Sequence, residues 1–493
     1  MNFLNNISFK GTTKVYAFTD SHQESRKTSA IMSEVLSDAK DKDNALLLFG
    51  GDMFKGIYPR ELEKDSFMKL KESKPDIEMV MTLGNNDFGF FKESFDYLVN
   101  TVKNFSSKGI HTVCANMFDT ETGKRPDWLK PYTVVTRDND RTFVTGFCTE
   151  NVGTAKFGLS PKKSEELIEE ISEAIKKEKP DNVVILNHDY KDSSENLVNK
   201  FKEKGIKVDL VIGGHDHNRV EPDSVSSIYY PESFSETMYK FDLENNEGRK
   251  GITSAKELNW KDCSISPLFE SELTKQEQEL GLFDVIAPSV LDLPKTYNDP
   301  NPLGSFLADK LKEKGKTDIA FFSTGFLMAP MPYAENQNIT KYRLKKTMAA
   351  ENPIVKETLT VNDLKAVFEN ALKGRGYGNS NPKFLQCSNN VALEGENDTE
   401  NKVFRLKQIY INGEALLDKE GNPVDSQRTY TCAMDNYIAD GGQGYNVLKN
   451  KERTTLMLNN KEMRINDVLE NSLVEAARDY KKGESYPCFK IIE

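Results

Sequence analysis

Five short apolar segments in the first half of the chain each end in a turn that carries Asp, Asn or His. The segments cover residues 15–18, 45–49, 77–81, 182–186 and 207–212. We predict that they are strands, because each is short, apolar and bounded by polar turn residues. Predicted helices, with apolar residues three and four apart, alternate with them at residues 28–39, 160–179 and 195–204. This alternation predicts an α/β fold, in which ligands gather at the C-terminal ends of the strands.

The predicted helix at residues 160–179 has clear end signals. Ser160 is a favoured N-cap residue, and Pro161 suits the first helical position. Pro180 cannot continue a helix. We therefore expect this helix to begin directly after Ser160.

The turns carry side chains that are suited to binding metal ions. The chain has only 5 histidines, and all but His111 lie in these turns. Acidic and amide residues at equivalent positions complete the set, which is Asp20, His22, Asp52, Asn85, His188, His215 and His217. A single Asp or His after a strand usually caps a turn, so the interpretation depends on the whole set. Imidazole and carboxylate ligands at one sheet edge suit two divalent metal ions.

Size and charge narrow the range of partners. At 493 residues the chain predicts two large domains, on a prior of roughly 100–200 residues per domain. The 77 acidic and 66 basic side chains give a net charge of −11, which disfavours polymeric nucleic acid and anionic membranes as partners. We expect a small anionic substrate, for which a bound metal supplies the local cation, and a monomer or dimer.

The N-terminus lacks the basic start and the continuous apolar core of a signal peptide. No segment approaches the ~20 consecutive apolar residues that span a bilayer. We therefore expect a cytoplasmic protein without membrane association. An exported protein whose leader has been trimmed would give the same sequence.

The turn motifs resemble those of the calcineurin-like metallophosphoesterases. The matching motifs are Asp20-Ser21-His22, Gly51-Asp52, Gly84-Asn85, His188 and Gly214-His215-Asp216-His217. The resemblance implies a four-layer α/β/β/α sandwich that binds two divalent metal ions, drawn from Mn, Zn, Fe, Co and Ni. It places Asp20, His22 and His217 on one ion. It places Asn85, His188 and His215 on the other, with Asp52 bridging the two.

The resemblance also implies a mechanism. A hydroxide that bridges the metal ions attacks the phosphorus atom, and the two ions, about 3.5–4 Å apart, hold the phosphoryl oxygens. Asp52, as the bridging ligand, and the residue at position 86 would then lie at the reacting centre.

The second half of the chain resembles the substrate-binding domain of the 5′-nucleotidase and 2′,3′-cyclic phosphodiesterase branch of that family. The likeness lies at residues 301–309, 339–352, 384–388 and 437–445. We predict helices here at residues 303–313, 361–372 and 467–481. A polar stretch at residues 266–281 predicts a connector helix. The expected domains are therefore a metallophosphoesterase domain at residues 1–265 and a C-terminal α/β domain at residues 282–493.

Four residues of the second half are candidates for substrate contact. Phe384 and Tyr445 match the aromatic residues that sandwich a nucleobase in the family, and either ring can stack on a base. The alternative is that both belong to the core. Asn352 matches a polar substrate contact, and Arg375, in a Gly-rich loop, would meet a phosphate group unless it is simply solvated.

The sequence departs from the family pattern at the catalytic positions. Asn86 stands where the family has a catalytic His, and Gly89 stands where nucleotidases have the Asp that orients it. Met328 replaces an Arg that grips the phosphate, and Gln443 replaces an acidic residue of the Gly-rich loop. An amide cannot supply a proton near neutral pH, so substrates with poor leaving groups suffer most.

Three functions therefore remain open. The first is a metal-dependent phosphohydrolase of nucleotide-like substrates, shifted from simple 5′-monophosphates toward diesters, cyclic nucleotides or pyrophosphates. The second is a catalytically weak, metal-containing nucleotide-binding protein. The third is a conventional 5′-nucleotidase in which another residue supplies the proton.

Overall fold

The computed structural model separates into two compact units, residues 1–276 and 277–493. It describes most of the chain, namely residues 12–39, 44–89, 92–137, 140–220, 227–246, 249–294, 296, 298–327, 338–348, 352–373, 375, 383–398, 400–401, 403–481 and 484–492. Met328 lies outside the described residues.

Two sheets form the centre of the first unit. The larger sheet has the order β13 (Arg249–Asn259), β12 (Thr237–Asn246), β1 (Thr12–Phe18), β2 (Asn44–Phe49), β3 (Glu78–Met81) and β4 (Ile110–Thr112). The smaller has the order β11 (Ile228–Tyr229), β10 (Leu210–Gly214), β9 (Asn182–His188), β7 (Asp140–Cys148) and β6 (Tyr132–Arg137). The strands β1, β2 and β3 are parallel, as are β9 and β10. The five predicted strands are therefore confirmed.

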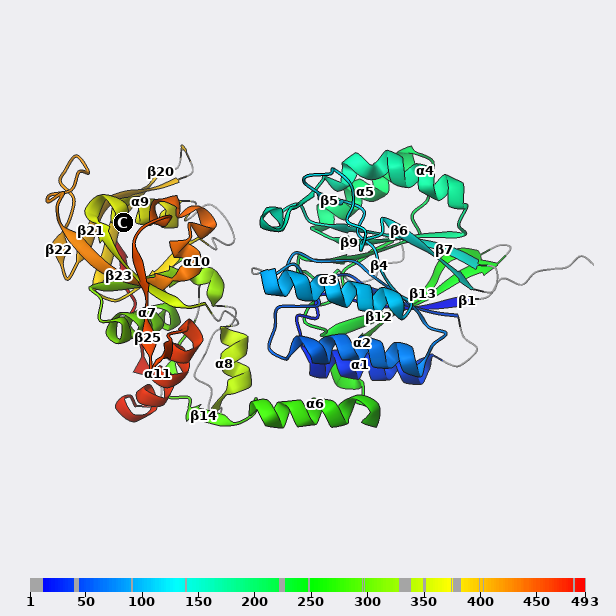
Figure 1. Cartoon of the computed structure of the whole chain (residues 1–493), viewed down its shortest axis with the longest axis horizontal. Helices are drawn as coiled ribbons and strands as arrows, with labels where there is room; N and C mark the ends of the chain where they lie inside the picture. Colours follow the sequence, from blue (N-terminus) through cyan, green and yellow to red (C-terminus); the bar gives the residue numbers. More distant parts are fainter. Residues whose placement is uncertain are drawn as a thin grey trace, which may run out of the picture. The chain divides into compact units, whose positions relative to one another are not determined.

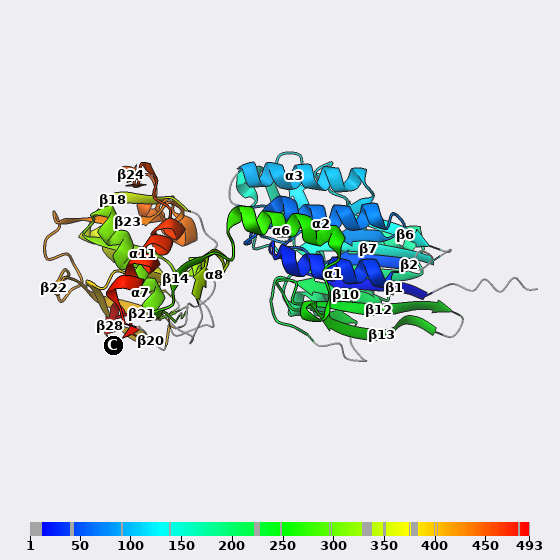
Figure 2. The same cartoon turned by 90° about the horizontal axis from the view of Figure 1, so that it is seen from below.

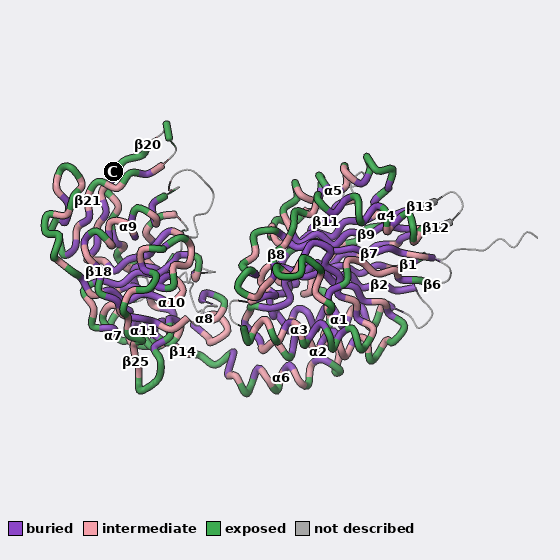
Figure 3. Tube along the Cα trace, turned by 45° about the horizontal axis from the view of Figure 1, so that its top comes forward, coloured by how far each residue is buried: buried purple, intermediate pink, exposed green. Residues whose placement is uncertain are grey.

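The strand residues alternate between two apolar layers, as the period of two along a strand requires. In β1, Val15 and Ala17 face the other sheet, whereas Tyr16 and Phe18 face the helices α1 (Ser25–Asp38), α2 (Arg60–Ser73) and α3 (Lys92–Ser107). The outer face of the smaller sheet packs against α4 (Ile168–Glu178) and α5 (Lys191–Glu203). Figure 1 shows these helices on opposite sides of the two sheets, and Figure 3 shows the buried strands between exposed helix surfaces. The expected four-layer α/β/β/α sandwich is confirmed.

The helix predicted at residues 160–179 begins later than expected. Ser160 and Pro161 belong to the short strand β8 (Leu159–Pro161), which pairs with β5 (Met117–Asp119). A 3-10 turn over Ser164–Leu167 then leads into α4. The prediction of a start at Ser160 was wrong because pairing with a distant strand outweighed the local helix-start signals, and tertiary context commonly overrides them.

A mixed sheet forms the centre of the second unit. Its order is β19 (Leu385–Cys387), β16 (Ile319–Ser323), β23 (Thr429–Asp435), β18 (Ile354–Thr360) and β24 (Arg453–Thr455). One face packs on α7 (Pro302–Gly315) and α11 (Ile465–Asp479). The other packs on α9 (Val361–Leu372) and on a second sheet of β22 (Glu414–Ala415), β21 (Val403–Ile411), β20 (Val391–Asp398) and β28 (Lys490–Ile492). The three helices predicted here are confirmed, with ends shifted by no more than two residues.

Short elements complete the described chain. Two-stranded pairs are formed by β14 (Val285–Pro288) with β17 (Asn338–Thr340), β15 (Leu291–Asp292) with β27 (Glu484–Ser485), and β25 (Met457–Leu458) with β26 (Lys461–Glu462). The short helices are α8 (Lys341–Thr347) and α10 (Asn436–Ala439). None of the described helices combines the length and the apolar character that crossing a bilayer requires.

A helix occupies the stretch that we expected to connect the domains. This helix, α6, spans Pro267–Leu280, and its residue Phe269 is buried in the core under α1 and α2. Figure 2 shows α6 running beside these helices. The division between the two units falls inside α6, between residues 276 and 277. The domain limits at residues 265 and 282 stay a prediction.

A buried carboxyl group lies between α1 and α2. Glu63 of α2 is 0% exposed and accepts hydrogen bonds from Ser25 Oγ (2.9 Å) and Thr28 Oγ1 (2.8 Å) of α1. Burial raises the pKa of Glu63 to about 7, although the hydroxyl groups of Ser21, Thr28 and Ser25 oppose the shift.

We expect Glu63→Gln to reduce the loss of stability of the first unit as the pH rises. Between pH 4.5, the ordinary pKa, and about 7, the unfolded chain releases a proton that the folded state retains. The wild type therefore loses up to ~3 kcal/mol across this window, whereas an amide does not titrate. Calorimetric Tm values across the window, with Glu61→Gln on the same helix as the control, measure the difference. Parallel Tm curves for wild type and Glu63→Gln would contradict this account.

Candidate metal centre

The turns after five strands bring the predicted metal ligands together. Asp20 and His22 follow β1, Asp52 follows β2 and Asn85 follows β3 in the larger sheet. His188 ends β9, and His215 and His217 follow β10 in the smaller sheet. The parallel strands of each sheet place these turns at its C-terminal edge, and the distances below show that the two edges meet.

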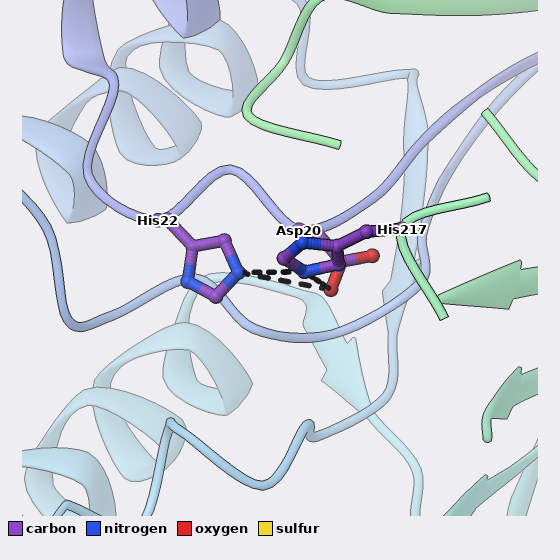
Figure 4. Close-up of side chains that lie close together, drawn as sticks. All are labelled: Asp20, His22 and His217. Atoms are coloured by element: carbon purple, nitrogen blue, oxygen red, sulfur yellow. Dashed lines mark hydrogen bonds and ion pairs between the residues drawn. The ribbon is translucent and has the colours of Figure 1, made fainter. Parts of the chain in front are cut away.

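Asp20, His22 and His217 form one group. Their metal-binding atoms all lie within 4.8 Å of one another. The Nε2 atoms of His22 and His217 are 3.2 Å apart, and His217 Nε2 lies 3.3 Å from Asp20 Oδ1. Figure 4 shows the three side chains pointing toward one another from turns that are far apart in the sequence. Two imidazole nitrogens and a carboxylate oxygen that converge in this way suit a divalent cation.

A second group lies next to the first. His188 Nε2 is 3.3 Å from Asp52 Oδ2 and 3.9 Å from Asp20 Oδ1, and these three residues also meet within 4.8 Å. His215 Nδ1 lies 2.7 Å from Asn85 Oδ1. Asp52 Oδ2 is also 3.7 Å from His22 Nε2. Asp52 therefore lies between the two groups, where a bridging ligand would have to be.

Hydrogen bonds within the protein do not satisfy all of the buried donor atoms, whereas bound metal ions would. His188 Nε2 and His215 Nε2 are buried, and neither has a hydrogen-bond partner. Buried polar atoms of this kind cost free energy unless a partner satisfies them. His188 Nδ1 is fixed by the carbonyl of Gly50 at 2.8 Å, which orients the ring with Nε2 toward Asp52. A hydrogen bond to the far nitrogen is the usual way in which a protein orients a histidine ligand.

Five of the predicted ligands have a strained backbone. The φ angles are 47° at Asp20, 47° at His22, 58° at Asp52, 77° at His215 and 55° at His217. A positive φ is uncommon in residues other than glycine, and such strain concentrates at functional sites. Backbone hydrogen bonds between the turns hold these conformations, including His22 N to Asp52 O at 3.0 Å and Asp20 N to Gly51 O at 2.9 Å.

Burial and the charges of neighbouring residues have opposite effects on the pKa values of His188 and Asp52. Burial disfavours protonation of His188, but the carboxylates of Asp52 and Asp20 outweigh it and raise its pKa to about 10. Burial alone would raise the pKa of Asp52, but His188, His22 and the amide of Asn86 hold it well below its usual range. Asp52 is therefore ionised at neutral pH, as a metal ligand must be, whereas His188 would have to release its proton to bind an ion.

Asp87 fixes the turn after β2 against the turn after β3. Its Oδ1 accepts hydrogen bonds from Met53 N (2.8 Å) and Phe54 N (3.0 Å). Its Oδ2 accepts from Asp52 N (3.0 Å) and Gly84 N (2.8 Å). Asp87 is 3% exposed, and its carboxylate is directed at these backbone amides rather than at a substrate. A side chain at position 84 would also place its Cβ 2.1 Å from Asp52 Oδ1, so only glycine fits there.

Asn86 contacts Asp52 and a lysine that the sequence analysis did not single out. Asn86 Nδ2 donates to Asp52 Oδ2 at 2.6 Å, and Asn86 N donates to Asp52 Oδ1 at 2.8 Å. Lys55 Nζ donates to Asn86 Oδ1 at 3.0 Å. In the sequence, the only indication for Lys55 was its position three residues after Asp52. This indication is weak, because many of the 66 basic residues lie as close in sequence to an acidic residue.

The candidate substrate contacts of the second unit have partners within that unit. Phe384 and Tyr445 are each 1% exposed in its core, and the Tyr445 hydroxyl donates to the carbonyl of Lys383. Asn352 Nδ2 donates to Asn436 Oδ1 at 3.2 Å. Arg375 forms an ion pair with Asp299 at 2.8 Å. Substrate contact by these four residues stays a prediction.

Comparison with protein-family models identifies both halves of the chain. Residues 13–219 match the model described as calcineurin-like phosphoesterase. Residues 279–450 match the model described as 5′-nucleotidase, C-terminal domain. The first match contains all seven predicted metal ligands.

Two curated proteins align along most of the chain. The trifunctional nucleotide phosphoesterase protein YfkN of Bacillus subtilis (strain 168) is 22% identical over 493 aligned positions, which cover 87% of this chain and 32% of YfkN. The chain thus spans about a third of that relative. An apyrase of Aedes albopictus is 23% identical over 471 positions, which cover 85% of this chain and 78% of the apyrase.

A solved structure shows the same arrangement of elements. The 5′-nucleotidase precursor from Thermus thermophilus is 18% identical, with a TM-score of 0.71 over 98% of this chain and 100% of its own. At this identity the likeness shows the fold. The calcineurin-like match is followed along the chain by the 5′-nucleotidase match, and together they cover most of it, so the chain belongs to the two-domain 5′-nucleotidase family of calcineurin-like phosphoesterases.

Proposed function

We propose that this protein is a divalent-metal-dependent hydrolase of phosphoester bonds in nucleotide-like substrates. Its specificity is shifted from simple 5′-monophosphates toward diesters, cyclic nucleotides or pyrophosphates. The observation that carries the proposal is the convergence of Asp20, His22, Asp52, His188 and His217 beside an amide, Asn86, at the catalytic position.

The centre is proposed to hold two divalent ions, drawn from Mn, Zn, Fe, Co and Ni. Asp20, His22 and His217 would hold one, Asn85, His188 and His215 the other, and Asp52 both. Ions bound there would act as Lewis acids that polarise the phosphoryl oxygens. The distances between the donor atoms, and the buried Nε2 atoms of His188 and His215 that lack a hydrogen bond, support this assignment.

Asn86 accounts for the proposed shift in specificity. Its side-chain amide is fixed by Asp52 and Lys55, so it donates a hydrogen bond but gives no proton to a leaving group. General acid catalysis typically contributes about 10²–10⁴-fold, and esters that leave as alkoxides depend on it most. A leaving group that is already a stable anion, such as a phosphate or a nitrophenolate, needs no proton.

We expect Asp52→Asn to abolish turnover and to weaken metal binding. The substitution removes the negative charge that lies between the two groups of predicted ligands. The kcat should therefore fall by more than the roughly 10- to 100-fold that is typical when a residue that hydrogen-bonds to a metal ligand is lost. The assays are Mn²⁺ content of the purified protein and hydrolysis of bis(p-nitrophenyl) phosphate, nucleotide diesters and diphosphates. Asp216→Asn is the control, because that carboxylate pairs with Asn218 instead (2.8 Å).

If the Mn²⁺-loaded wild type hydrolyses none of these compounds, the proposal is wrong. The second candidate, a nucleotide-binding protein with little activity, would then stand if calorimetry shows micromolar nucleotide binding without turnover. The amide at position 86 is the observation that favours it. Turnover by the wild type that Asp52→Asn removes would exclude it.

We expect Asn86→His to raise kcat for AMP by about tenfold to a hundredfold, because an imidazole can protonate the departing 5′-oxygen. The gain should stay near the lower end of the usual range, since Gly89 offers no side chain to orient the ring. Hydrolysis of bis(p-nitrophenyl) phosphate should change little and serves as the internal control. An equal change for both substrates would contradict the proton-donor explanation, and efficient AMP hydrolysis by the wild type would favour a conventional 5′-nucleotidase.

A further inference from the structure

A chain of hydrogen bonds leads from the buried centre to an exposed cation. Asp52 is 1% exposed, and its Oδ2 accepts from Asn86 Nδ2 at 2.6 Å. Asn86 is half-buried, and its Oδ1 accepts from Lys55 Nζ at 3.0 Å. Lys55 itself is exposed. Its ammonium group is therefore linked to the proposed bridging ligand through Asn86, on the solvent side.

The backbone on both sides of Lys55 is fixed. Before it, the amides of Met53 and Phe54 are held by the carboxylate of Asp87. After it, Gly56 N donates to Gln23 Oε1 at 2.9 Å. A Cβ at position 56 would lie 1.5 Å from the carbonyl oxygen of His22, so this stretch is pressed against the turn that carries two predicted ligands. The backbone at Lys55, and with it the Cβ atom, is therefore held in position in the same way as the turns that carry the predicted ligands.

The conformation of Lys55 is itself unfavourable. Its φ is 73°, in the left-handed region where glycine costs least and a long side chain is disfavoured. A strained residue at such a place is a reason to look for a function of its side chain.

We propose that Lys55 is a substrate-contacting residue whose ammonium group binds a phosphoryl oxygen and makes the centre favour phosphoryl groups with two negative charges over those with one. This inference rests on the proposed function. Asn86, which is neutral, cannot balance the charge of a substrate, whereas an ammonium group makes the stronger, charge-assisted hydrogen bond. Diesters and cyclic nucleotides carry one charge on the phosphoryl group, so among the substrate classes proposed above the inference favours pyrophosphates with a free terminal phosphate, which carries two.

A purely structural role for Lys55 would be to hold Asn86. Lys55→Gln separates the two roles, because a glutamine amide can still donate to Asn86 Oδ1 but carries no charge. Lys55→Arg keeps the charge, and Lys55→Gly removes the side chain together with the left-handed strain. The control is Lys92→Gln, which removes an exposed lysine of the same unit whose partner is Asp96 (2.8 Å).

The first measurement is calorimetric binding of inorganic phosphate to the Mn²⁺-loaded protein. We expect Lys55→Gln to weaken phosphate binding by about tenfold or more, the usual range for a lost hydrogen bond to a charged group. Lys55→Arg should bind within a few-fold of the wild type. Lys55→Gly should lose binding as Lys55→Gln does, yet have a Tm no lower than the wild type. Mn²⁺ content should be the same in all variants.

The second measurement compares p-nitrophenyl phosphate with bis(p-nitrophenyl) phosphate, which share a leaving group but differ by one charge. In Lys55→Gln, kcat/KM should fall by about tenfold for the monoester and by about threefold for the diester, since the Coulomb energy scales with charge. Equal losses for both esters, or unchanged phosphate binding in Lys55→Gln, would overturn the inference. If the wild type hydrolyses neither of these esters, nor the nucleotide diesters and diphosphates, the proposed function fails, and phosphate binding alone still decides the role of Lys55.

Discussion

The carboxylate of Asp87 holds the centre together. It accepts four backbone N–H groups, three from the turn after β2 and one from the turn after β3. Burial and the charge of Asp52 raise the pKa of Asp87 to about 7, against the opposing effect of the amides. Four hydrogen bonds to one carboxylate fix two turns whose own residues have unfavourable backbone angles. Asp52 and Asn86 are in position because of this contact.

In the candidate metal centre, hydrogen bonds between the turns stabilise residues whose φ angles are unfavourable. Left-handed angles at Asp20, His22 and Asp52 cost about 1–3 kcal/mol each. Such angles persist only where the surroundings over-determine them, and here each turn bonds to the next. Lys55, three residues after Asp52, also has a left-handed φ angle. The left-handed positions in these turns include five of the predicted ligands as well as Lys55.

The sequence predicted the layered fold and the meeting of the ligands because both follow from local rules. Short apolar strands that alternate with helices allow few topologies, and parallel strands bring their C-terminal turns to one edge. The start of α4 could not be predicted in this way, since the pairing of β8 with β5 joins residues 159–161 to residues 117–119. Local signals at Ser160 and Pro161 carry no information about that partner.

Other features depend on distances that no sequence pattern encodes. The packing of the turns alone shows that Lys55 reaches Asn86. It alone shows that Asp87 binds backbone amides rather than a substrate. The burial of Phe384 and Tyr445 could not be predicted either, because the sequence alone does not distinguish an aromatic residue of the core from one that binds a ligand. Sequence motifs selected the predicted ligands, while the surrounding contacts required coordinates.

The turns are tied to one another by the protein itself, through bonds such as His22 N to Asp52 O and Gln23 N to Met53 O. The donor atoms therefore keep their places whether or not a cation holds them, so one ion can be exchanged for another without rebuilding the turns. The donors are imidazole, carboxylate and amide groups, which several first-row metals accept. Selectivity among such metals comes from geometry, ligand type and metal availability rather than from raw affinity, so the supply of ions would help to decide which of them such a site holds.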